Sequence, residues 1–124
     1  MWDGINRRKF PRANYKCLIG IKKRLNAKTI STQTENIGAG GICVLLKEDL
    51  GLFQGVDVEL FLDQSRPPIK CGGTVVWVVK KSSSKKGATI YDTGIEFIDM
   101  RPEDRDKISE AVEEILKTHS KKKI

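Results

Sequence analysis

The stretch Val56-Asp57-Val58-Glu59-Leu60-Phe61-Leu62 decides the fold, because an apolar side chain stands at every second position. Successive side chains of a β-strand point to opposite faces, so this alternation is typical of a strand with one buried face. Similar runs, alternating or rich in β-branched residues, recur at short intervals and predict six strands, at residues 15–23, 29–34, 42–46, 56–62, 69–80 and 89–98. The pair Gly72-Gly73 predicts a bulge or sharp bend in the fifth of these strands.

The pattern changes from strand to helix after Asp99. A helical stripe follows, formed by Ile108, Val112, Ile115 and Leu116. Pro102 suits a first helical turn, and the acidic residues at 103 and 104 suit the positive end of a helix dipole. We therefore predict a helix from Pro102 to about Lys117.

Short strands at regular spacing, with glycine bends, favour a closed or nearly closed antiparallel sheet. The predicted fold is mainly β: a small six-stranded antiparallel β-barrel with a C-terminal amphipathic α-helix that covers an opening or edge. Residues 1–14 are basic and interrupted by proline, and we expect them to form a flexible arm. The barrel and helix then occupy residues 15–117, and a basic tail occupies residues 118–124.

Composition narrows the class of partner. A chain of 124 residues fits one domain, and 39% hydrophobic with 31% charged residues indicates a soluble globular protein. The formal net charge of +7 favours anionic partners: nucleotides, nucleic acid or an acidic membrane surface. No apolar run is long enough for a membrane span, and the start of the chain does not resemble a signal peptide. The odd, widely spaced set of Cys17, Cys43 and Cys71 is typical of the cytoplasm.

Neither catalysis nor a metal site finds support in the sequence. The single histidine, His119, lies in the basic tail, and the serines at 82–84 form a low-complexity loop rather than a nucleophile elbow. The cysteines form no CxxC pair and have no nearby histidine, which argues against zinc. Carboxylates at 99, 103 and 104 suit a helix start. We predict a protein that is not an enzyme and has no cofactor or metal.

Two segments together form a candidate anion site. The arm carries Arg7, Arg8 and Arg12, with Pro11 stiffening it, and arginine offers planar forks that suit phosphate and guanine edges. The segment from Asn36 to Gly41 supplies an amide side chain and three glycines, whose backbone N–H groups a ligand can approach closely. Each segment also has a simpler interpretation, a basic leader without a ligand for the arm and an ordinary turn between two strands for the segment from Asn36 to Gly41.

These residues carry a resemblance to a known family. Arg8-xxx-Arg12 followed by Asn36-x-Gly38-x-x-Gly41 resembles the paired motif of the PilZ domain, RxxxR and [D/N]xSxxG. The resemblance continues through residues 73–78 and 93–97 and the terminal helix, and covers roughly residues 5–117. One departure is clear, since Gly38 stands where the family pattern has serine.

The resemblance implies a small β-barrel that binds the bacterial second messenger cyclic di-GMP. Arg8 and Arg12, with Arg7 as a possible third, would supply charge and guanine recognition. Asn36 and the backbone at Gly38 and Gly41 would fix the position of the ligand. Binding would order the arm and signal to a downstream protein partner.

Alternatives remain open at this point. Trp77, flanked by valines, is either a core or barrel-rim residue or a wall that faces the ligand and stacks on a purine. The glycine at 38 keeps open a PilZ-like protein-interaction adaptor that no longer binds nucleotide. A single-stranded nucleic-acid-binding barrel is the third class. It is the least favoured, because aromatic residues are only 6% of the chain and Phe61 stands alone as an exposed candidate.

Overall fold

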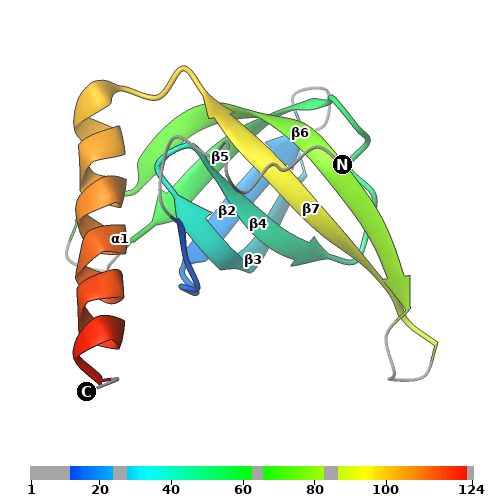
Figure 1. Ribbon diagram of the computed structural model, residues 1–124. Coiled ribbons are helices and arrows are strands. Elements are labelled where there is room, and N and C mark those ends of the chain that lie inside the picture. The colour runs from blue at the N-terminus through cyan, green and yellow to red at the C-terminus, as the bar shows by residue number, and fades with distance from the viewer. Residues whose placement is uncertain (1–11, 24–27, 63–65, 83–86, 123–124) are drawn as a thin grey trace, which may run out of the picture.

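A computed structural model describes residues 12–23, 28–62, 66–82 and 87–122 (Figure 1). The predicted Arg7 and Arg8 therefore lie outside the described residues. Within the described ranges, seven strands precede one helix: β1 (Arg12–Ala13), β2 (Leu18–Lys23), β3 (Thr29–Gly38), β4 (Gly41–Leu46), β5 (Gly55–Phe61), β6 (Ile69–Ser82), β7 (Thr89–Ile98) and α1 (Pro102–Lys122).

The strands form one closed antiparallel barrel. Their order is β1-β3-β2-β5-β6-β7-β4, and a further pairing of β3 with β4 closes the sheet on itself. Six strands make the barrel, as predicted, and β1 is a short seventh strand added beside β3. Closure pairs the strand edges with one another, so the barrel does not leave the open edges that an unclosed sheet would expose.

The alternation of the strands fills the barrel with apolar side chains. Ile19, Ile21, Val56, Val58 and Leu60 are all at most 2% exposed, in keeping with the period of two that predicted their strands. Because side chains occupy the interior of a barrel of this size, a ligand must bind to its outside.

The helix α1 stands along one side of the barrel and packs against β1 and β3 (Figure 1). Ile108 and Val112 are almost fully buried in the common core. The predicted end of the helix near Lys117 is wrong, because α1 continues to Lys122. No glycine or proline occurs among these last residues to stop it. Within the described ranges, no helix is both long and apolar enough to cross a membrane.

The strand register corrects two details of the prediction. Gly72 and Gly73 keep regular pairing with both neighbours, and the bulge in β6 lies instead at Val76, between Val75 and Trp77. A Cβ atom at Gly73 would lie 2.6 Å from the Ile95 side chain, so the glycine serves close packing at this point.

The glycine-rich turn is also shorter than predicted. Asn36, Ile37 and Gly38 belong to β3, and only Ala39 and Gly40 form the turn into β4. A second bulge, at Glu35, separates the two halves of β3.

Candidate functional site

Strand pairing brings the arm and the glycine-rich segment together. Arg12 in β1 is the register partner of Gly38 in β3, and Gly38 is in turn the partner of Gly41 in β4. The same row continues across β7 and β6 through Glu96 and Thr74. The last arginine of the first motif is thus adjacent in the sheet to the second motif, which lies some 25 residues later in the sequence.

A second row runs parallel to the first, on the outer face of the barrel. It consists of Asn36 in β3, Cys43 in β4, Gly94 in β7 and Trp77 in β6. The row between these two points inward, because its members Ile37, Ile42, Ile95 and Val75 are at most 1% exposed. Asn36 and Trp77 therefore share the outer face with Gly38 and Gly41.

Two bulges place Asn36 and Trp77 on this outer face. Thr34 is fully buried and Val75 points into the core, so regular alternation would also turn residues 36 and 77 inward. The extra residues Glu35 and Val76 each shift the alternation by one position. The structure thus places Trp77 on the outer face of the barrel rather than in the core.

The Trp77 indole lies against the backbone of Gly94. The nearest atoms to a Cβ built on Gly94 are three carbons around the fused bond of the indole, all inside contact distance. Three ring carbons at nearly equal range mean that the Cβ would meet the ring face rather than its edge. Only a glycine at position 94 allows the ring to lie this close to the sheet.

Asp92 connects the side chains around the indole. Its Oδ1 accepts hydrogen bonds from Cys43 Sγ at 2.9 Å and from Trp77 Nε1 at 3.5 Å. Its Oδ2 lies 3.3 Å from Lys81 Nζ. Partial burial acts to raise the pKa of Asp92, but these hydrogen bonds and the lysine charge together hold that pKa below its ordinary value.

One glycine of the predicted motif has a packing role. Among the described glycines, a positive φ occurs at Gly51 and Gly87, so Gly38 and Gly41 do not use left-handed backbone. A Cβ at Gly41 would run into the carbonyl oxygen of Ile95, so this glycine lets β4 approach β7 closely. The pairing of β4 with β7 thus requires glycine at position 41, whether or not a ligand binds there.

The base of the arm is fixed to β3 by a buried threonine. Thr34 Oγ1 donates to the Tyr15 carbonyl at 2.6 Å and accepts from the Cys17 backbone N–H at 3.1 Å. The Thr34 N–H also donates to the Cys17 carbonyl at 3.0 Å. Together with the pairing of Arg12 and Ala13 to β3, these bonds tie the chain to the barrel from residue 12 onward, so the last residues of the arm predicted over residues 1–14 belong to the anchored part.

The described residues show no arrangement suited to a metal, since histidine, cysteine, aspartate and glutamate side chains nowhere gather in threes among them. Burial raises the pKa of the Cys17 and Cys71 thiols, that of Cys71 to about 11, and so disfavours the thiolate form of both. A reactive thiolate is not expected at either position.

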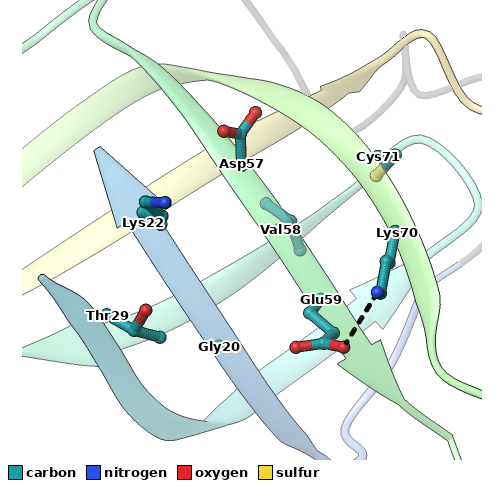
Figure 2. A pocket seen from close by; sticks show the side chains of 8 residues that line it. All are labelled: Gly20, Lys22, Thr29, Asp57, Val58, Glu59, Lys70 and Cys71. Carbon is teal, nitrogen blue, oxygen red and sulfur yellow. Dashed lines mark ion pairs between the residues drawn. The ribbon is translucent and has the colours of Figure 1, made fainter. Parts of the chain in front are cut away.

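A hollow of about 530 Å³ lies elsewhere, over β2, β5 and β6 (Figure 2). Its lining includes Gly20, two lysines and two carboxylates. One lysine already pairs with a carboxylate, Lys70 Nζ with Glu59 Oε2 at 3.8 Å. The four charges cancel, so this hollow does not favour an anion.

Three residues that lie around the Trp77 indole on the outer face were not predicted as site residues. They are Cys43, Asp92 and Gly94. Gly94 did carry a signal, because an isolated glycine within a strand often marks a close approach. Nothing local marked Asp92 or Cys43, since their roles depend on cross-strand register.

The fold has well-defined structural relatives. The E. coli YcgR PilZ domain with c-di-GMP superposes with a TM-score of 0.69 at 15% identity, over 94% of this chain and 96% of that chain. The K. pneumonia MrkH–c-di-GMP complex gives 0.75 at 15% identity, over 94% and 55%. Bacillus subtilis MotI/DgrA, an inhibitor of motility, gives 0.71 at 20% identity, over 95% and 53%, so this chain spans about half the length of that protein.

No curated protein sequence matches the chain. The family model of the PilZ domain, in contrast, matches residues 6–114, which include most of the basic arm, the glycine-rich segment, the whole barrel and most of the helix. With the barrel closed as the motifs imply and the arm paired to the glycine-rich segment, the chain belongs to the PilZ domain family.

Proposed function

We propose that this protein is a receptor for cyclic di-GMP, which binds on the outer face of the barrel between the basic arm and the Asn36–Gly41 segment. The observation that carries the proposal is the pairing of Arg12 with Gly38, beside the row that holds Asn36 and Trp77. Structures of two relatives with the same fold, YcgR and MrkH, contain c-di-GMP.

The chemistry of the ligand suits this face. A cyclic dinucleotide presents two phosphates, and each guanine offers O6 and N7 acceptors on one edge and a wide aromatic face. Arginine can fork onto the guanine edge or pair with a phosphate, which is the role we propose for Arg8 and Arg12, with Arg7 as a third. Asn36 can both donate to and accept from the ligand, and the Trp77 indole can stack on a base.

Gly38 lacks the hydroxyl of the family's serine, and this weakens the site without removing it. One neutral hydrogen bond contributes about 0.5–1.5 kcal/mol, or about 2- to 13-fold in affinity. Hydrogen bonds to charged groups are roughly twice as strong as neutral ones, so the arginine contacts outweigh the missing hydroxyl.

Signalling follows from ordering of the arm, which would create or expose a surface for a downstream protein partner. The protein acts in this scheme as a receptor and not as an enzyme, so it should return the nucleotide unchanged. The cytoplasm, expected from the spacing of the cysteines, is the compartment we propose.

Calorimetric titration with cyclic di-GMP, beside GTP and a linear RNA, tests the proposal. We expect cyclic di-GMP to bind with a Kd of about 1 µM or below, and GTP and the RNA much more weakly. Chromatography of the nucleotide after incubation should show it intact. Flat calorimetry at high protein concentration would reject the receptor function and favour the adaptor, which has the same fold and the same glycine at position 38.

A further inference from the structure

The carboxylate of Asp92 joins side chains from two neighbouring strands on the outer face of the barrel. Cys43 on β4 donates to it at 2.9 Å, and Trp77 on β6 donates to the same oxygen at 3.5 Å. Lys81, also on β6, faces the second oxygen at 3.3 Å. Asp92 itself lies on β7, between β4 and β6, two residues before the glycine under the indole.

We propose that Asp92 is a positioning residue for ligand binding, which holds the Trp77 indole flat on Gly94 so that the outward ring face is ready to stack on a guanine base. This inference rests on the proposed function. It adds to that function a residue outside both sequence motifs.

The contacts explain how one carboxylate can fix a ring. Gly94 defines the plane of the indole, because a backbone without Cβ is the surface on which the ring lies. A flat surface alone still allows the ring to turn within its plane. The hydrogen bond from Nε1 to Asp92 removes this freedom, because only one in-plane orientation directs the N–H to the carboxylate.

The other two partners of Asp92 fix the carboxylate and balance its charge. The Cys43 thiol, only 7% exposed, binds the same oxygen that accepts from Trp77, and so limits rotation of the carboxylate. Lys81 offsets the negative charge. Without that lysine, a carboxylate beside the site would repel the phosphates of the ligand.

This arrangement gives a test in which two explanations predict opposite signs. If Asp92 acted only through its charge, its removal would strengthen the binding of an anionic ligand. If Asp92 orients Trp77, its removal weakens binding. We expect Asp92→Ala to raise the Kd for cyclic di-GMP about 5-fold or more, within the range that loss of one aromatic stacking contact produces.

Three further variants make the comparison specific. Asp92→Asn keeps an acceptor oxygen and loses the charge, so it should bind close to the wild-type affinity. Asp57→Ala removes an equally negative side chain from the hollow over β2, β5 and β6, and should leave affinity unchanged. In a Trp77→Phe background, whose ring cannot donate to Asp92, adding Asp92→Ala should have no further effect.

A measurement without nucleotide separates this inference from the proposed function. In a Trp2→Phe background Trp77 is the only tryptophan, since the chain has two. Asp92→Ala should then lower the fluorescence anisotropy of Trp77, and Asp92→Asn should restore it. If wild-type protein does not bind cyclic di-GMP, the proposed function fails and this anisotropy alone decides whether Asp92 positions the indole.

Three results would overturn the inference. They are unchanged anisotropy in Asp92→Ala, unchanged or tighter nucleotide binding by that variant while the wild type binds, and an equal loss of affinity in the Trp77→Phe background. Thermal melting of every variant shows whether the barrel is intact.

Discussion

Replacing Gly94 by alanine tests the packing on which the candidate site depends. A Cβ at this position meets three ring carbons of Trp77 inside contact distance, so the indole must move away from the sheet. Overpacking of this kind costs about 1–3 kcal/mol. The ring would also lose its hydrogen bond to Asp92, because a donor–acceptor distance of 3.5 Å cannot lengthen further without breaking the bond. We therefore expect the free energy of unfolding to fall by about 2 kcal/mol.

Urea denaturation followed by circular dichroism measures this change. For a domain of this size the melting temperature should drop by roughly 6–12 °C, since 1 kcal/mol corresponds to a few degrees. Gly20→Ala is the matched control. Gly20 also lies within a strand on the outer face, but a Cβ there would meet only ordinary contacts, the nearest at 3.4 Å from Thr29. Gly20→Ala should be neutral or slightly stabilising, because alanine has fewer accessible backbone conformations than glycine in the unfolded chain.

A double-mutant cycle identifies the source of the loss. In a Trp77→Val background the new methyl group has no ring to displace, so Gly94→Ala should then cost almost nothing. The reasoning is refuted if Gly94→Ala is as stable as wild type, or if it costs the same with valine at position 77. Either result would mean that the indole does not rest on Gly94 in solution.

Three more predictions concern ligand binding and the contacts of the Asp92 carboxylate. Arg8→Ala and Arg12→Ala should each weaken binding of cyclic di-GMP by about 2–4 kcal/mol in calorimetry and leave the unliganded melting temperature nearly unchanged; a large melting shift with intact affinity would make the arm structural. Gly38→Ser should tighten binding by about 0.5–1.5 kcal/mol, because position 38 has no left-handed backbone that would strain a serine; weaker binding at unchanged stability would contradict the hydrogen-bond account. Because the pKa of Asp92 is lowered in the folded state, its carboxylate stabilises the fold at pH values above the ordinary pKa of 3.8, and this contribution is lost as pH falls through the folded-state value. Asp92→Asn should therefore flatten the acid side of a stability–pH curve below about pH 4. An unchanged curve would show that the carboxylate has no such partners in solution.

The barrel could be predicted from the sequence because burial alternates along most of its strands. The predicted strand at 89–98 has the observed bounds, the one at 42–46 begins one residue late, and the one at 56–62 is displaced by one residue at both ends. Strand β3 was predicted to end four residues early, because Asn36 and Gly38 read as turn residues. Pairing of the same segment with β1 on one side and β4 on the other overrides that local preference.

The candidate site was predictable only in part, for a physical reason. The motif residues could be recognised by their type and spacing, so the sequence was enough to propose Arg12, Asn36, Gly38 and Gly41. Which face each side chain takes depends on register, and register depends on bulges that leave no local trace. The glycine pair at 72 and 73 predicted a bulge or bend there, whereas the bulge that turns Trp77 outward lies at Val76, among neighbouring valines.

The two bulges show how a filled barrel can acquire a binding surface. A regular strand through Thr34 would direct residue 36 into the core, and a regular strand through Val75 would do the same with residue 77. Such a barrel would bury an amide and an indole where the interior needs aliphatic groups. One extra residue in each strand solves this conflict, since positions before the bulge keep the faces that regular alternation gives them and positions after it change face. Both bulges lie beside the same pair of strands, β4 and β7, so Asn36 and Trp77 emerge in one row with Gly94 between them. The bulges and the glycine therefore belong to the site as much as the motif residues do.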